Sequence, residues 1–278
     1  MMRRDIKMVG LDLDGTLLDS NKVFTEYSKG IVTEAIRRGV VVLPATGRPA
    51  CGIPKDVMEF PGVRYAVTAN GARVVDLREN RVLFECLLSY GEGRKLLEIF
   101  RKYDTYMEVY FEGFGYAQAD GMKQISRFIS SAPMAEYVLS TRKPVEDLYE
   151  FFCREQKGAD KIQAMFANQD EKEAAFEEIR AALPDAEVTG ALFNNIEVNG
   201  RGARKGAALV RLGEMLGISR EEIMACGDGS NDLDMIREAG LGIAMANGIE
   251  QIRLEADGVT LSNDEDGAAK AIETYVLK

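Results

Sequence analysis

The chain carries two carboxylates two residues apart in the segment DLDGTLL, residues 12–18. This segment follows the apolar run Ile6–Leu11, which predicts a strand, so Asp12 and Asp14 leave the C-terminal end of that strand. Open parallel sheets bind their ligands at that end, and Gly15 permits a sharp turn that presents both carboxylates to one bound group. A bare pair of this kind is more often an acidic turn, so the interpretation needs support from other segments.

Two further predicted strands end in residues that suit phosphate chemistry. The segment TGR (46–48) follows one of them, and the segment GDGSND (227–232) follows the other. Thr46 offers a hydroxyl and Gly47 an unobstructed backbone N–H to a phosphate oxygen. Lys205 stands at the predicted start of a helix, where a cation opposes the helix dipole and is poorly explained as a stabilising feature. We expect these segments to converge on one site.

Composition excludes several other kinds of protein. The 278 residues include no histidine, which rules out Ser-His-Asp, Cys-His and two-histidine metal sites. A formal net charge of −10 argues against a nucleic-acid partner, because such binding depends on clustered lysine and arginine. The four cysteines lie far apart without a C-x-x-C pair, which suits reduced thiols in the cytoplasm. No apolar run approaches the roughly 20 residues needed to cross a bilayer, and no export signal is visible, so we expect no membrane partner.

Short β-branched runs alternate with amphipathic helical segments at both ends of the chain. This alternation predicts an α/β fold whose core is a Rossmann-like, doubly wound parallel sheet. The strands are expected at Ile6–Leu11, Val40–Ala45, Tyr65–Ala69, Ile223–Cys226 and Leu241–Ala244, and the helices at Thr25–Arg38, Arg204–Leu216, Asn231–Ala239 and near Gly267.

The middle of the chain has a different pattern, in which strands pair as hairpins. It predicts an inserted α+β cap domain at 85–189, between core segments 1–84 and 190–278. A capping box in which Asp170 precedes Glu173 opens one of the cap helices. The hairpins are expected at Arg73–Asp76 with Arg81–Glu85 and at Thr105–Phe111 with Phe114–Ala119, helices at Pro144–Phe152 and Asp170–Leu183, and a strand at Ile162–Phe166.

The order of these motifs resembles that of haloacid dehalogenase (HAD) superfamily hydrolases. D-x-D-G-T-L-L, T-G-R, a Lys-Gly helix start and G-D-G-x-N-D follow one another as the four motifs of that superfamily do. A cap between the second and third motifs, together with the segments NGA (70–72) and NDEDG (263–267), resembles the Cof-type (class IIB) phosphatases. The resemblance spans nearly the whole chain, and within the cap it concerns layout more than residues.

The resemblance implies a phosphatase mechanism with an aspartyl-phosphate intermediate. Asp12 is then the nucleophile, and Asp14 the general acid and base. Three carboxylates brought together repel one another, so a counter-cation is required. Mg²⁺ fits best, with Asp12, Asp14 and Asp228 as ligands and Asp14 binding through its backbone carbonyl. Asp232 is expected to orient these ligands.

The remaining predicted site residues surround the phosphoryl group and the substrate. Lys205, Thr46, Gly47 and Asn231 are expected to hold the phosphoryl oxygens while charge builds. Arg48 and Asn70 are possible contacts on the substrate side. The cap is expected to close over the core and to choose the substrate, a small phosphorylated metabolite such as a sugar phosphate.

Two alternatives remain open at this point. A phosphosugar mutase uses the same aspartyl-phosphate but returns the phosphoryl group to sugar. A catalytically silent phosphate-binding or regulatory protein could keep the same fold without turnover. The sequence does not identify the substrate, the pathway or the oligomeric state.

Overall fold

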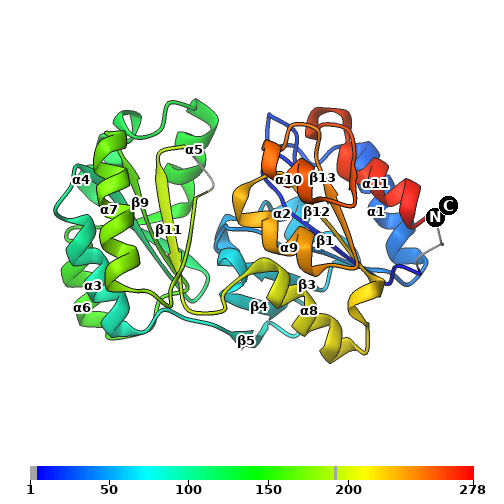
Figure 1. Ribbon diagram of the computed structural model, residues 1–278, viewed down its shortest axis with the longest axis horizontal. Helices are drawn as coiled ribbons and strands as arrows, with labels where there is room; N and C mark the ends of the chain where they lie inside the picture. Colours follow the sequence, from blue (N-terminus) through cyan, green and yellow to red (C-terminus); the bar gives the residue numbers. More distant parts are fainter. Residues whose placement is uncertain (1–4, 191–192) are drawn as a thin grey trace. The chain divides into compact units, whose positions relative to one another are not determined.

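The computed structural model describes residues 5–190 and 193–278. The chain divides into two compact units (Figure 1). The first unit consists of the segments up to Gly47, Ile53–Phe84 and Arg204–Lys278, and the second of Arg48–Gly52 and Glu85–Ala203.

The first unit is built on a five-stranded sheet in the order β14-β13-β12-β1-β2, with every neighbouring pair parallel. Its strands are nearly all buried, as expected where helices cover both faces of a parallel sheet. The strands are β1 (Met8–Leu11), β2 (Val41–Pro44), β12 (Ile223–Gly227), β13 (Leu241–Ala244) and β14 (Gly258–Val259).

Helices pack on both faces of this sheet (Figure 1). On one face, α1 (Glu26–Arg37) and α11 (Gly267–Tyr275) share a hydrophobic cluster with β1, β12 and β13. On the other face, α8 (Lys205–Leu216) and α9 (Leu233–Glu238) form a second cluster with the same sheet. The predicted doubly wound α/β core is confirmed. The unit also contains α2 (Lys55–Met58) and α10 (Glu250–Glu255).

A small sheet in the order β3-β4-β5 lies next to β2. Its first strand, β3 (Tyr65–Thr68), pairs antiparallel with β4 (Arg73–Asp76), and β5 (Arg81–Glu85) completes the sheet. One parallel bridge, between Ala45 and Val67, links β3 to the end of β2. The strand predicted at 65–69 therefore exists, but it lies outside the parallel ladder.

The second unit is an α+β structure with a six-stranded sheet in the order β10-β11-β9-β6-β7-β8. The hydrophobic cluster on one face of this sheet joins it to α3 (Tyr90–Phe100), α6 (Leu148–Glu155) and α7 (Gln169–Ala182) (Figure 1). The strands are β6 (Thr105–Phe111), β7 (Phe114–Gln118), β8 (Arg142–Val145), β9 (Lys161–Phe166), β10 (Glu187–Thr189) and β11 (Asn195–Asn199), and two further helices are α4 (Ala119–Lys123) and α5 (Ala132–Thr141).

Three details of the second unit differ from the sequence prediction. The boundary expected at 189/190 lies at 203/204, because β11 pairs antiparallel with β9 and so belongs to this sheet. The side chain that caps α7 is Asn168, which accepts from the N–H groups of Asp170 and Glu171, so the capping box predicted at Asp170 is wrong. Pro144 lies in β8 and not in a helix; β8 is an edge strand, where the missing proline N–H is tolerated.

Among the described residues, no helix combines the length and the apolar character that crossing a bilayer requires.

Candidate active site

Asp12 lies at the carboxyl end of β1, where the chain leaves the sheet. Its N–H donates to the carbonyl of Cys226 on β12 at 3.0 Å, which continues the parallel ladder by one residue. Asp228 follows the last residue of β12, and Thr46 follows β2 by two residues. The three predicted motif segments therefore meet at one edge of the sheet, because parallel strands end on the same side.

Three carboxylates gather at this edge. Asp12, Asp228 and Asp232 offer oxygen atoms that all lie within 4.8 Å of one another. Gly15 allows the close approach, since it has a φ of +83° and a Cβ placed there would lie 2.4 Å from an Asp228 oxygen. The hydroxyl of Thr16 donates to Asp228 Oδ1 at 2.8 Å. The loop after β1 therefore fixes two of the three carboxylates.

The carboxyl of Asp14 is not part of this cluster. Its Oδ1 accepts a hydrogen bond from Lys22 Nζ at 2.8 Å, and about a third of its side chain is exposed. The sequence prediction brought the carboxylates of Asp12, Asp14 and Asp228 together and assigned metal binding by Asp14 to its backbone carbonyl. The carboxylates that the structure groups are those of Asp12, Asp228 and Asp232. The side chain of Asp14 thus lies outside the group of three, although its charge still raises the pKa of Asp12.

Lys205 is fully buried and supplies the positive charge of the cluster. Its Nζ donates to Asp12 Oδ1 at 2.7 Å and to Asp232 Oδ1 at 2.6 Å. Burial alone would lower the pKa of Lys205, but the charges of Asp12 and Asp232 outweigh it and raise the pKa well above its usual range. Lys205 is therefore a permanent ammonium ion, and it stands at the first position of α8 as predicted.

Asp232 is bonded on both of its oxygens. Oδ1 accepts from Lys205, and Oδ2 accepts from the backbone N–H groups of Asp228 and Gly229, each at 3.0 Å. These bonds hold the loop that carries Asp228 and, at the same time, the ammonium that contacts Asp12. The arrangement suits a residue that orients the site more than one that reacts.

The carboxylates are difficult to ionise together. Burial raises the pKa of Asp12 well above its usual range; Lys205 counteracts this, but Asp232, Asp228 and Asp14 raise it further. Burial and the charge of Asp232 raise the pKa of Asp228 to about 7. One lysine does not compensate this much negative charge, so the cluster can bind a further cation.

A second group of polar residues lies at the ends of β2 and β3. Thr46 and Asn70 are buried, and the N–H of Asn70 donates to the carbonyl of Thr46 at 3.0 Å. The amide of Asn231 donates to Asn70 Oδ1 at 3.2 Å. A Cβ at Gly47 would lie 2.8 Å from that same oxygen, so only glycine leaves its backbone accessible here. The structure brings these four predicted residues together.

Arg48 belongs to the second unit. Its guanidinium donates to the carbonyl of Gly52 at 2.7 Å and stacks over the ring of Tyr137, 4.2 Å from the centroid. The side chain is 7% exposed, so these contacts account for its position without a ligand.

Two asparagines that were not predicted as site residues support the loop after β1. Asn247 donates to the carbonyl of Gly15 at 2.8 Å and accepts from the N–H of Asn263 at 3.0 Å. Asn263 donates in turn to the carbonyl of Leu18 at 3.0 Å. The signal in the sequence was the segment NDEDG (263–267), which matched the Cof-type pattern without indicating what its asparagine does.

A family model described as haloacid dehalogenase-like hydrolase matches residues 9–272 of the chain. The chain belongs to the haloacid dehalogenase-like hydrolases. The membership predicted from the order of the four motifs is therefore confirmed, and the loop and cluster geometry above can be treated as that of a HAD hydrolase.

Relatives of this HAD hydrolase are named phosphatases. The 5-amino-6-(5-phospho-D-ribitylamino)uracil phosphatase YcsE of Bacillus subtilis is 30% identical over 273 residues, which cover 98% of this chain and 97% of that protein. A haloacid dehalogenase-like hydrolase from B. subtilis has a TM-score of 0.86 at 27% identity and covers 98% of this chain and 100% of its own.

The HAD hydrolase also shares the fold of the subclass IIB sugar phosphatase BT4131. That structure has a TM-score of 0.81 at 22% identity and covers 98% of this chain and 100% of its own. At this identity the similarity concerns the fold, and it agrees with the predicted Cof-type, class IIB layout.

The donor set of the HAD hydrolase suits a divalent cation that prefers oxygen ligands. Asp12 and Asp228 would hold the ion, because Asp232 already accepts bonds on both of its oxygens. Neither histidine nor a cysteine pair is present to favour a softer metal. The residues therefore fit a magnesium-like ion.

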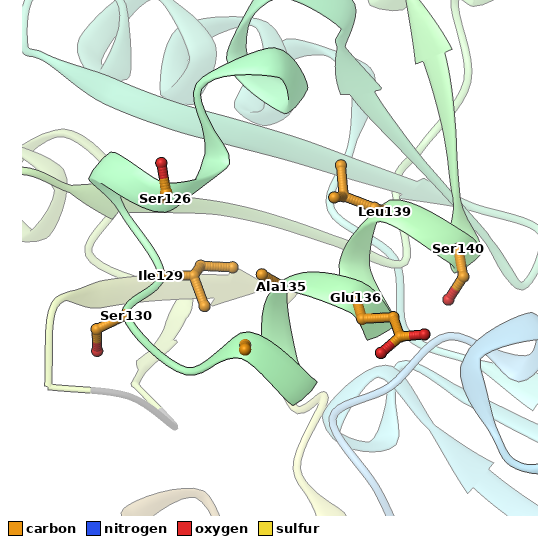
Figure 2. A pocket seen from close by; sticks show the side chains of 8 residues that line it. Ser126, Ile129, Ser130, Ala135, Glu136, Leu139 and Ser140 are labelled. Carbon is orange, nitrogen blue, oxygen red and sulfur yellow. The ribbon is translucent and has the colours of Figure 1, made fainter.

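The second unit of the HAD hydrolase contains an apolar pocket of about 630 Å³ (Figure 2). Leu139 and Ala135 on α5 lie opposite Ile129, with Glu136 and serine side chains around them. Its lining includes none of the residues predicted for the phosphoryl site, which belong to the first unit except for Arg48. The lining residues are Ser126, Ile129, Ser130, Ala132, Ala135, Glu136, Leu139 and Ser140.

Proposed function

We propose that this HAD hydrolase is a Mg²⁺-dependent phosphatase that hydrolyses a small phosphorylated metabolite through an aspartyl-phosphate on Asp12. The observation that carries the proposal is the buried contact of Lys205 with both Asp12 and Asp232, next to Asp228. An ammonium ion at this place opposes the effect of burial on the pKa of Asp12 and can neutralise a phosphoryl oxygen.

In the proposed first half-reaction, a carboxylate oxygen of Asp12 attacks phosphorus in line. The bond from phosphorus to the substrate oxygen breaks, and Asp14 protonates that oxygen as it leaves. Lys205, together with the groups at Thr46, Gly47 and Asn231, binds the phosphoryl oxygens. A divalent ion, when bound, neutralises charge on the phosphoryl group and on the carboxylates.

In the proposed second half-reaction, water attacks the phosphorus of the aspartyl-phosphate. Asp14 accepts a proton from that water, and the electron pair of the breaking bond returns to the carboxylate of Asp12. Inorganic phosphate leaves, and Asp14 is protonated again for the next substrate. The cycle needs no group beyond those already named.

The relatives' names support a substrate class. YcsE acts on a phosphorylated ribitylaminouracil by its name, and BT4131 is named a sugar phosphatase. We therefore propose a phosphomonoester of a sugar or similar polyol as the substrate. We further propose that the second unit is a substrate-specificity cap, that Arg48 and Asn70 lie on the substrate side, and that the enzyme works in the cytoplasm.

The test is phosphate release from a panel of sugar phosphates, nucleotides and phosphorylated cofactors, with Mg²⁺ and with EDTA. We expect steady release with Mg²⁺, none with EDTA, and loss of at least about 10³-fold in Asp12→Asn. Isomerisation of a sugar phosphate without phosphate release would favour a mutase. No turnover of any substrate by the wild-type enzyme would favour a phosphate-binding protein.

A further inference from the structure

Lys22 contacts the proposed general acid and base from a loop that the mechanism does not otherwise use. Its Nζ donates to Asp14 Oδ1 at 2.8 Å, and the two side chains are 29% and 31% exposed. An isolated ion pair at such exposure adds little stability, since side-chain entropy and solvent screening offset the attraction. We therefore expect this ion pair to act on the position of Asp14 and not on stability.

The loop that presents Lys22 is closed by its own hydrogen bonds. Asp19 Oδ1 accepts from the N–H groups of Asn21 at 2.9 Å and Val23 at 2.8 Å, and the N–H of Lys22 donates to the carbonyl of Asp19 at 2.9 Å. Lys22 has a φ of +64°. Residues other than glycine adopt this backbone conformation at a cost in free energy, and only where the surrounding structure imposes it. The loop thus fixes the direction in which this lysine leaves the backbone.

The same loop is attached to the C-terminal part of the first unit. Ser20 donates from its N–H to Asp264 Oδ1 at 2.7 Å and from its hydroxyl to Asp264 Oδ2 at 2.8 Å. Asn263 donates to the carbonyl of Leu18, just before the loop. Lys22 is therefore carried on a support with fixed points on both sides, as a positioning group requires.

We propose that Lys22 is the positioning residue for Asp14 and that its ammonium holds the Asp14 carboxylate away from the cluster of Asp12, Asp228 and Asp232. The inference rests on the phosphatase function proposed above. Without Lys22, the Asp14 carboxyl would lose the bond that fixes its direction. Each carboxylate oxygen has two lone pairs, so the bond from Lys22 does not exhaust the capacity of Asp14 to accept a proton.

In the proposed mechanism Asp14 accepts a proton from water, so the position of its carboxyl matters for that step. The consequence falls on the second half-reaction, in which water attacks the aspartyl-phosphate. Formation of the aspartyl-phosphate from an activated aryl ester makes little demand on Asp14, because nitrophenolate leaves without a proton. Loss of Lys22 should therefore separate the two half-reactions.

The experiment measures p-nitrophenyl phosphate hydrolysis by Lys22→Met with Mg²⁺ present, in the steady state and in a stopped-flow burst. We expect kcat to fall at least about 10-fold, because positioned proton transfer is worth roughly 10²- to 10⁴-fold. We expect kcat/KM to stay within about 3-fold, and a burst of nearly one nitrophenolate per active site. Lys22→Arg should keep most of kcat and show a smaller burst.

Lys29→Met is the matched control. Lys29 lies on α1, its side chain is 27% exposed, and it pairs with Glu26 at 3.0 Å. The substitution therefore removes a similar surface ion pair and leaves Asp14 unchanged. It should leave kcat, kcat/KM and the burst unchanged. Melting temperatures of all variants should agree within a few degrees.

A double-mutant cycle with Asp14→Asn tests whether Lys22 acts through Asp14. Asp14→Asn alone should show the same burst, and Lys22→Met should add no further loss of kcat in that background. Equal losses of kcat and kcat/KM, an unchanged kcat, or a full additional loss in Asp14→Asn would each overturn the inference. A wild-type enzyme without phosphate release would instead overturn the proposed function.

Discussion

The two units of this HAD hydrolase both bury charged side chains, but the charges are balanced in only one of them. In the second unit, Arg142 pairs with Glu108 at 2.8 Å and Lys161 pairs with Glu197 at 3.0 Å. All four side chains are at most 5% exposed. Each of these two buried carboxylates has a cation of its own, and the hydroxyl of Tyr110 also donates to Glu108 at 2.9 Å.

In the first unit, one ammonium serves a group of carboxylates. Lys205 contacts Asp12 and Asp232, and Asp228 lies within 4.8 Å of both. The excess of negative charge raises the pKa of Asp12 and of Asp228. Burying such an excess costs stability unless a ligand compensates it.

The comparison teaches how to separate structural charge from functional charge. Where each buried charge is paired with one of opposite sign, as in the two ion pairs of the second unit, burial needs no ligand. An unbalanced cluster is stabilised by a partner from outside the chain, so it suits the cation and the anionic substrate that we propose. The following predictions test this distinction, from the largest expected effect to the smallest.

Replacement of Lys205 should have the largest effect. Lys205→Met removes the cation that faces the proposed phosphoryl site, so kcat/KM should fall by about 10²- to 10³-fold or more. Phosphate release from the best substrate of the panel measures the loss. Activity within 10-fold of the wild type would mean that the buried ammonium is structural, as in the second unit.

Arg142→Met should show the opposite pattern. It leaves Glu108 buried without its cation, so the free energy of unfolding should drop by about 3–5 kcal/mol, measured by denaturant titration. The folded fraction should keep kcat within a few-fold. Adding Glu108→Gln to this variant should recover part of the stability, and a loss of kcat that this double variant does not recover would contradict a structural role.

Mg²⁺ should stabilise the protein through the first unit alone. At a concentration about 100 times its dissociation constant it should add roughly 2.7 kcal/mol, seen as a higher melting temperature than with EDTA. Asp228→Asn should lose most of this shift, because it removes a proposed ligand. Glu197→Gln in the second unit is the control and should keep the Mg²⁺-dependent rise in melting temperature. Identical melting temperatures of the wild type with Mg²⁺ and with EDTA would contradict the proposed metal site.

Replacement of Asp234 should have the smallest effect on stability. Among the described residues, this carboxylate accepts a hydrogen bond from a backbone N–H and forms no ion pair. It accepts from the N–H of Gly206 at 2.7 Å, and burial raises its pKa to about 6. The folded state then binds a proton more tightly than the unfolded state, whose pKa is near 3.8. This favourable contribution is complete below about pH 4 and disappears as the pH rises through about 6.

Asp234→Asn should remove that pH dependence while it keeps an oxygen for Gly206. Relative to the variant, the wild type should lose about 1–2 kcal/mol of stability between pH 4 and pH 7, measured by denaturant titration at each pH in EDTA. Parallel curves for the two proteins over this range would show that Asp234 does not titrate there.

The first unit could be predicted well from the sequence because its site residues directly follow strands or begin helices. Strands and helices alternate there, and residues that directly follow a parallel strand must share one edge of the sheet. This reasoning grouped Asp12, Thr46 and Asp228 before any coordinates were considered. It also identified Lys205, since a lysine at a helix start is electrostatically out of place unless anions lie nearby.

What the sequence could not predict depended on contacts between distant segments. The carboxyl of Asp14 pairs with Lys22, whose backbone is left-handed, and no spacing in the sequence predicts this ion pair. The strand β11 joins the second unit through its pairing with β9, which is a long-range choice that local propensity does not encode. The helix α3 was overlooked although its capping box, Ser89 with Glu92, is complete.

The bonds from Asn247 and Asn263 to the loop after β1 have a consequence for biosynthesis. The proposed nucleophile precedes this loop, but the carbonyls of Gly15 and Leu18 find their partners 232 and 245 residues later in the chain. A nascent polypeptide that stops before residue 247 would hold every proposed reacting group and still lack both asparagines that bond the loop. The segment that carries Asn247 and Asn263 must therefore leave the ribosome before the loop after β1 can reach the conformation seen in the structure.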